Sequence, residues 1–195
     1  MVKIKTFMRA NFERSIDAKR AFLDNQNAQD VFCAAAEMVL ERYRAGGRMY
    51  IFGNGGSAAD AQHLAAEFVS KLARDREPLP AEALTVDSSI ITAIGNDYGY
   101  DEVFARQLRG KATPKDVALA ISTSGNSKNI LRGLETCKAL DIPSVLFTGR
   151  DGGKAVTLSD YCVIAPGQDT ATIQELHIVF AHILCGYVEH HIFQE

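Results

Sequence analysis

The sequence predicts an α/β fold, a three-layer sandwich in which helices cover both faces of a central parallel sheet that N-terminal helices precede. Short apolar runs typical of buried strands alternate with longer segments of helical periodicity, which favours parallel strands joined by right-handed crossovers. Loops rich in glycine and serine follow two of these runs, and ligands bind such sheets at the carboxyl ends of the strands. The 195 residues suffice for one domain with a full core, which we expect over residues 1–195.

Two helices are expected ahead of the sheet. Apolar residues recur at helical spacing over residues 5–23 and again over residues 31–44, and Gly46 follows the second segment as a helix terminator. Helices in front of a parallel sheet often supply a surface for self-association. We therefore expect residues 1–46 to serve oligomerisation.

Five apolar runs are expected to form the sheet, and five further segments to form helices. The first run ends at Phe52 and leads into an alanine-rich segment, in which Ser57 and Asp60 resemble an N-terminal capping pair. Asp87 suits the cap of a later, short helix. The expected strands are residues 49–52, 83–86, 116–121, 144–147 and 161–164, and the expected helices are residues 57–69, 90–94, 103–108, 128–140 and 172–193.

Composition and charge exclude several classes of partner. The net charge of −3 and the absence of a long basic run argue against nucleic acid, and no apolar run looks long enough to span a bilayer. The N-terminus has no apolar core typical of a signal peptide. The 4 cysteines show no CxxC spacing, which favours reduced thiols. We expect a cytoplasmic protein that binds neither nucleic acid nor membrane.

The first glycine-rich loop combines an anion cradle with ionisable side chains on the next helix. Its glycines allow positive φ and a close approach of the backbone to a ligand, and free amides at a helix start suit an anion. His63 and Glu67 lie four residues apart on one face of that helix. Such a pair is also common as a surface salt bridge, so by itself it leaves both interpretations open. The loop consists of Gly53, Asn54, Gly55, Gly56 and Ser57.

The second loop has the sequence STSGNS and follows the run at residues 116–121. Its hydroxyls and amides can surround one phosphate without a basic residue. The alternative is a loop of turn formers and helix caps. No lysine follows in Walker fashion and the first loop does not match GxGxxG, so neither a nucleoside triphosphate nor a dinucleotide is expected. The four hydroxyls belong to Ser122, Thr123, Ser124 and Ser127.

The last expected helix carries a further set of ligand-type residues. Imidazole and carboxylate beside a phosphate site suit proton transfer at a carbon next to a carbonyl, because Glu can abstract the proton and His can protonate the oxygen. A metal held by His and carboxylate would polarise that carbonyl or order the site. These residues favour aldose–ketose isomerisation of a sugar phosphate. The set on the last helix is Gln174, Glu175, His177 and His182.

Five motifs taken in order resemble the phosphoheptose (sedoheptulose-7-phosphate) isomerases of the sugar isomerase (SIS) fold, a flavodoxin-like sandwich. STSGNS alone indicates only a sugar-phosphate fold, whereas His63, Glu67, Gln174 and His182 make the resemblance specific to the isomerases. The resemblance covers residues 44–195, and the leading helices also fit the tetramer-forming start of the family. The motifs are GNGGSAADAQHLAAEF, AIGNDYGYDEVF, ISTSGNS, FTGRDGG and IQELHIVFAHILCGYVEH.

The resemblance implies an activity and a role for each matching residue. It implies conversion of sedoheptulose 7-phosphate into D-glycero-D-manno-heptose 7-phosphate through an enediol, the first step of ADP-heptose supply for lipopolysaccharide or related glycans, in a homotetramer. Glu67 would be the base and His182 the acid. One zinc ion per subunit would be held by His63, Glu67, Gln174 and His182. Ser122, Thr123, Ser124 and Ser127 would hold the phosphate, while Asn54, Gly55, Gly56, Ser57, Glu67, Asn96, Asp97, Asp169 and Gln174 would contact the sugar.

Several alternatives stay open at this point. Some SIS proteins bind a replication initiator or sense sugar phosphates without catalysis, but those relatives lack the glutamate that is Glu67 here. An isomerase for a shorter sugar phosphate is equally compatible with the loops. Gln174 and His182 lie about 12 Å apart along one helix, so facing copies of that helix would complete a shared site. Lys71 stands where some family members carry an arginine, and it would keep the charge without the bidentate fork.

Overall fold

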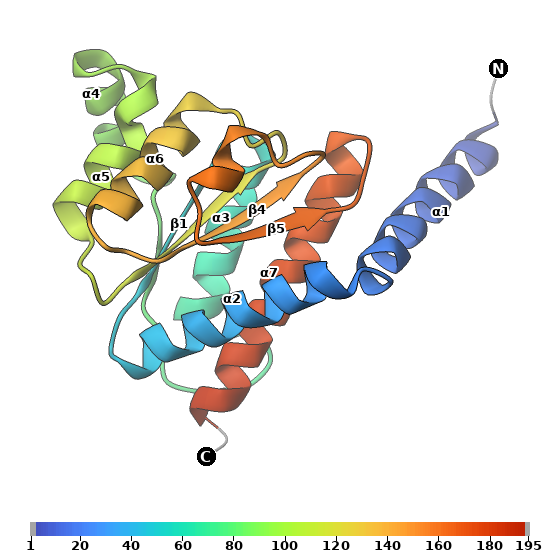
Figure 1. Ribbon diagram of the computed structural model, residues 1–195, viewed down its shortest axis with the longest axis horizontal. Helices are drawn as coiled ribbons and strands as arrows, with labels where there is room; N and C mark the ends of the chain where they lie inside the picture. The colour runs from blue at the N-terminus through green and yellow to red at the C-terminus, as the bar shows by residue number, and fades with distance from the viewer. Residues whose placement is uncertain (1–2, 194–195) are drawn as a thin grey trace.

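Five parallel strands form the central sheet of the computed structural model, which describes residues 3–193 (Figure 1). The strand order is β2-β1-β3-β4-β5, so the chain runs outward from β1 to β2 and then returns across β1 to build the other side. The direction in which the chain adds strands therefore reverses between β1 and β3. Such folds bind ligands at this point of the sheet. The strands are β1 Met49–Gly53, β2 Ala81–Ala83, β3 Val117–Ser122, β4 Ser144–Gly149 and β5 Tyr161–Ala165.

Helices cover both faces of the sheet, which confirms the predicted three-layer sandwich (Figure 1). Alternate residues of β1 enter different cores: Ile51 packs with α2, α3 and α7, and Phe52 packs with α5 and α6. Residues 1, 2, 194 and 195 of the expected domain lie outside the described part. The helices are α1 Ile4–Leu23, α2 Gln26–Arg44, α3 Gly56–Val69, α4 Ser88–Asp97, α5 Val103–Lys111, α6 Lys128–Ala139 and α7 Thr170–Phe193, with 3-10 turns η1 Tyr100–Glu102 and η2 Gly153–Thr157.

Several predicted boundaries are wrong: α4 and α5 extend beyond the expected residues 90–94 and 103–108, and two other boundaries have local reasons. The second helix begins at Gln26, five residues before the expected start, because the side chain of Asn25 accepts a hydrogen bond from the Ala28 amide and caps it. The second strand covers Ala81–Ala83 and not residues 83–86. It is a short edge strand paired only with β1, and Leu84 is buried by the core on the α5 and α6 side although it follows the strand.

The predicted capping pair of the third helix is also wrong. Gly55, with φ of +57°, occupies the N-cap position, and Ser57 lies inside the first turn without capping it. This conformation suits glycine because it has no Cβ. By contrast, Asp87 does accept a hydrogen bond from the Ile90 amide and caps α4, as predicted.

The first helix leaves most of its apolar side chains exposed. Phe7, Phe12 and Leu23 are 60, 65 and 66 % exposed, while Ser15 and Ala18 are buried. Figure 1 shows the N-terminal part of α1 extending away from the sheet. Large exposed apolar surfaces mark interaction sites, and the role of this helix in self-association stays a prediction.

The last helix begins two residues before the expected residues 172–193, and it corrects the expectation that no apolar run is long enough to span a bilayer. Among residues 3–193, α7 is the one helix whose length and composition would let it cross a membrane. Half of its most apolar window is buried within the fold, and it carries the buried side chains of His177 and Glu189. These features are typical of a core helix.

His177 is a fully buried, uncharged histidine on α7. Its Nε2 donates a hydrogen bond to the carbonyl of Thr148, 2.9 Å away, and its Nδ1 has no partner. Burial lowers the pKa of His177 to about 4, although the bond to Thr148 acts in the opposite direction. The fold therefore holds this side chain in its neutral form.

Acid is expected to destabilise the protein through His177. Because the folded pKa lies below the unfolded one, the stabilisation is complete above about pH 6.5 and is lost progressively as the pH falls towards 4, by about 3 kcal/mol in total. Urea unfolding of the wild type and of His177→Gln between pH 4 and 7.5 measures this. The variant keeps a donor for Thr148 but does not titrate. The free energy of unfolding of the wild type should therefore fall relative to that of the variant as the pH is lowered. Curves that stay parallel would contradict the assignment.

Candidate active site

The two predicted loops lie side by side at the carboxyl ends of neighbouring strands. Gly53 at the end of β1 pairs with Ile121 of β3, so the loops that follow both strands begin at the same edge of the sheet. Together with the start of α7 they line a hollow of about 220 Å³. Its lining residues are Asn54, Gly56, Ser57, Ile121, Ser122, Thr123, Ser124, Ser127, Thr170 and Gln174.

The serine-rich loop is held by its own backbone and leaves donors open towards this hollow. The hydroxyl oxygens of Ser122 and Ser124 accept hydrogen bonds from the amides of Gly125 and Asn126. Ser127 occupies the N-cap of α6, but its hydroxyl makes no capping bond. A helix N-terminus with a free hydroxyl suits an anion. This arrangement favours the phosphate interpretation over the alternative of a loop of helix caps.

Asn54 connects the two loops to a third segment. Its amide makes a reciprocal pair of hydrogen bonds with Asn129, both 2.8 Å long, and its Oδ1 also accepts a bond from the Tyr100 hydroxyl. Asn129 is buried at the start of α6. Sequence reasoning missed Asn129, Tyr100 and the hollow-lining Thr170. A polar residue inside the first turn after STSGNS was the only signal for Asn129.

His63, Glu67 and His182 come together although they belong to two helices from distant parts of the chain. Glu67 Oε1 lies 3.1 Å from His63 Nε2 and 3.2 Å from His182 Nε2. The Glu67 side chain is 11 % exposed, whereas those of His63 and His182 are 52 and 42 % exposed. The carboxylate therefore sits at the base of a pair of accessible imidazoles.

This trio has the geometry and the donor atoms of a metal site. One ligand atom from each residue can be chosen so that all three lie within 4.8 Å of one another. Glu67 Oε2 is buried and has no hydrogen-bond partner, which is costly for a carboxylate oxygen unless something else satisfies it. Two imidazole nitrogens and a carboxylate oxygen suit zinc.

The remaining site predictions fall at different places. Gln174 lies in the hollow against Gly56, where an added Cβ would come within 2.4 Å of Gln174 Nε2. Because eight residues separate them, Gln174 lies about 12 Å from His182 along α7. Asp169 accepts hydrogen bonds from the amide and hydroxyl of Thr172 at the start of α7. Asn96 and Asp97 are exposed at the end of α4 and do not line the hollow.

The other candidates on the last helix, and Lys71, have ordinary structural roles. His177 is the buried neutral histidine described above. Glu175 is exposed and lies 4.0 Å from the Lys19 amine. Lys71 is half-exposed after α3, with its amine 3.5 Å from Asp75. None of these three is part of the His63–Glu67–His182 trio.

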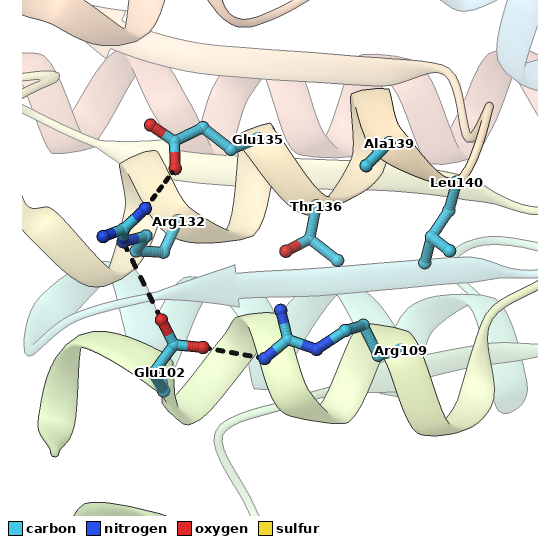
Figure 2. A pocket seen from close by; sticks show the side chains of 7 residues that line it. All are labelled: Glu102, Arg109, Arg132, Glu135, Thr136, Ala139 and Leu140. Atoms are coloured by element: carbon cyan, nitrogen blue, oxygen red, sulfur yellow. Dashed lines mark hydrogen bonds and ion pairs between the residues drawn. The ribbon is translucent and has the colours of Figure 1, made fainter. Parts of the chain in front are cut away.

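A second hollow, of about 250 Å³, lies between α5 and α6, away from the strand ends (Figure 2). Glu102 forms ion pairs with Arg109 at 2.7 Å and with Arg132 at 3.8 Å, and Arg132 also pairs with Glu135. Because these charges neutralise one another at the surface, this hollow offers no unpaired cation for a phosphate. We therefore place the functional site at the strand ends.

Known proteins share this fold and much of this sequence. The model of the SIS domain family matches residues 11–149 of the chain. A phosphoheptose isomerase of Aneurinibacillus thermoaerophilus is 47 % identical over 188 residues, covering 96 % of this chain and 95 % of that protein. The chain belongs to the phosphoheptose isomerase family.

Two further relatives support membership of the family. A phosphoheptose isomerase of Roseiflexus sp. (strain RS-1) is 49 % identical over 183 residues, covering 94 % of this chain and 92 % of that protein. The structure of phosphoheptose isomerase from Neisseria gonorrhoeae superposes with a TM-score of 0.89 at 39 % identity, covering 96 % of this chain and 99 % of that one. The resemblance inferred from the five motifs is thus confirmed.

Gly125→Ala is expected to weaken binding at the serine-rich loop. Gly125 has φ of +60°, and a Cβ there would meet the Gly152 carbonyl oxygen at 1.8 Å, so the loop must move. We expect at least about a tenfold loss of affinity for a sugar phosphate, measured by calorimetry. Gly110→Ala is the matched control, because its Cβ would meet nothing within 4 Å. Equal affinities for the two variants would show that this loop does not hold the phosphate.

Proposed function

We propose that this chain converts sedoheptulose 7-phosphate into D-glycero-D-manno-heptose 7-phosphate through an enediol, as the first step of ADP-heptose biosynthesis. The observation that carries the proposal is the position of the Glu67 carboxylate between His63 and His182, on helices that also border the phosphate hollow. The binding relatives considered from the sequence lack this glutamate. Its presence and its geometry favour catalysis over a binding role.

The two parts of the site divide the work. Hydroxyls and amides of the serine-rich loop hold the phosphate, and the glycine loop together with Gln174 orients the sugar chain. Glu67 removes the proton from the carbon next to the carbonyl, and His182 protonates the carbonyl oxygen to form the enediol. The burial of Glu67 keeps water from its carboxylate, while the exposure of His182 leaves that imidazole accessible to substrate.

We also propose one zinc ion per subunit, held by His63, Glu67, Gln174 and His182. The unpartnered Glu67 Oε2 and the two neighbouring imidazoles support the first, second and fourth ligands. Zinc, when bound, would polarise the substrate carbonyl or order these side chains. Gln174 lies about 12 Å along α7 from His182, so its participation requires a second copy of α7 that faces the first.

Self-association and location complete the proposal. The exposed apolar residues of α1 support a homotetramer, and the exposure of the His63 and His182 imidazoles is compatible with a site that a neighbouring subunit completes. The partner is a sugar phosphate, with neither nucleic acid nor membrane involved. A biosynthetic enzyme for this substrate belongs in the cytoplasm.

Replacement of the proposed base provides the test of function. The wild type loaded with zinc is expected to interconvert the two heptose phosphates and to exchange the substrate's carbon-bound proton with solvent deuterium. Glu67→Gln should lower both rates by at least about 10²-fold, because the amide cannot accept the proton. Affinity for the phosphate should change little, since the hollow is untouched. Mass spectrometry of the sugar phosphate measures the exchange.

Two results would count against this function. Deuterium incorporation by Glu67→Gln at the wild-type rate would remove Glu67 as the base. A wild-type protein that binds the heptose phosphate and turns none of it over, with zinc present, would make binding without catalysis the better account. Comparing kcat/KM for pentose, hexose and heptose phosphates decides whether a shorter sugar is the substrate.

A further inference from the structure

Arg76 and Glu189 form a buried ion pair between the loop that follows α3 and helix α7. Arg76 Nε lies 2.9 Å from Glu189 Oε2, and the two side chains are 2 and 3 % exposed. Arg76 belongs to the loop after α3, whereas Glu189 belongs to α7, two turns after His182. The pair therefore joins the element that carries His63 and Glu67 to the element that carries His182.

The Arg76 guanidinium also binds the last turn of α3, at the backbone of Glu67, the proposed base. Its Nη2 donates to the backbone carbonyl of Glu67 at 2.9 Å, and its Nη1 donates to the carbonyl of Phe68 at 2.7 Å. These carbonyls belong to the last turn of a helix, where no partner within the helix is available. Ser70 takes the C-cap position with φ of −89°, so no glycine supplies the usual left-handed end. The Arg76 guanidinium instead donates hydrogen bonds to the carbonyls at this end of the helix.

Glu189 holds the other side of the junction. Its carboxylate oxygens accept hydrogen bonds from the amides of Leu72 and Arg74, both at 3.2 Å, in addition to the bond from Arg76. Burial raises the pKa of Glu189, but the bonds from Arg76 and from these amides outweigh it and hold the pKa below the usual value. A charged carboxylate on α7 thus fixes the loop that follows α3.

We propose that Arg76 and Glu189 are positioning residues that fix the register of α3 against α7 and thereby hold Glu67 between His63 and His182. Apolar contacts between two helices are non-directional, whereas a guanidinium bonded to two carbonyls and a carboxylate at once fixes both position and direction. A metal or catalytic cluster needs its side chains within about 0.5 Å of their working positions. A buried ion pair adds little net stability over an apolar pair, and setting a register is its best-attested use.

The test measures zinc affinity as well as catalysis, because this inference rests on the proposed function. Zinc binding by the full-length protein is measured by competition with a chromophoric chelator, and Co²⁺ is substituted to follow the visible spectrum of the site. Arg76→Lys keeps the charge but loses the fork, and Glu189→Gln keeps the shape but loses the charge. Both are expected to weaken zinc binding about 10- to 100-fold and to alter the cobalt spectrum.

Kinetics separate positioning from binding of the phosphate. Because the phosphate hollow is built by other residues, kcat should fall at least about tenfold while KM for the heptose phosphate stays within about twofold. Glu102→Gln is the matched control: it breaks the exposed ion pairs between α5 and α6 that Figure 2 shows, and it should leave zinc affinity and kcat unchanged.

The contrary outcome is equally specific. Variants that melt at a lower temperature yet bind zinc and turn over substrate as the wild type does would make the pair purely structural and overturn the proposal. If Arg76→Lys fails to fold, the isosteric Glu189→Gln decides. Failure of the proposed function gives a different result. If the wild type binds zinc but turns over no substrate, the zinc competition with the two variants still tests whether the pair sets the register of α3 against α7. A wild type that binds no zinc would overturn the inference.

Discussion

The contact on which the site depends is that of the Glu67 carboxylate with two imidazoles, which belong to helices far apart in the chain. His63 shares a helix with Glu67, so local periodicity alone brings that pair together, but His182 arrives only because α7 packs against α3 on the same face of the sheet. Any sliding or rotation between these helices would separate the second imidazole from the carboxylate. The order of the sheet, the core beneath it and the buried Arg76–Glu189 pair together set the distance between the Glu67 carboxylate and the His182 imidazole.

Under the proposed function, the last helix also keeps the phosphate and the reacting groups at a set distance from each other. Gln174 near its start borders the phosphate hollow, and His182 two turns later reaches the trio. A sugar phosphate is an extended molecule, so a rigid helix that touches both regions sets the spacing between the bound phosphate and the reacting carbon. The glycine loop serves the same end from the other side, because Gly56 has no Cβ to displace Gln174. The spacing of Gln174 and His182 along α7 thus determines which part of the substrate each of them contacts.

Much of this arrangement could be predicted from the sequence, and the rest fails for identifiable reasons. The parallel sheet with helices on both faces follows from apolar runs that alternate with helical segments, and the two loops follow from the tendency of such sheets to bind ligands at strand ends. The hollow and the His63–Glu67 pair could therefore be predicted, whereas the strand order could not. The sequence misplaces the edge strand because Leu84 is buried although it lies outside the ladder. It also suggests Ser57 as the helix cap, whereas Gly55 takes the N-cap position with a positive φ. The contacts of Arg76 and Asn129 join residues far apart in the chain, and no local pattern encodes them.

X-ray absorption at the zinc edge, on the zinc-loaded wild type and on His182→Ala, tests the central claim most directly. The account predicts a first shell of nitrogen and oxygen at about 2.0–2.2 Å with imidazole scattering beyond it, and the loss of one imidazole in the variant. A sulfur contribution at about 2.3 Å would contradict it, because it would place the metal at a cysteine. An unchanged spectrum for His182→Ala would contradict it as well, since the two helices would then not share the ion.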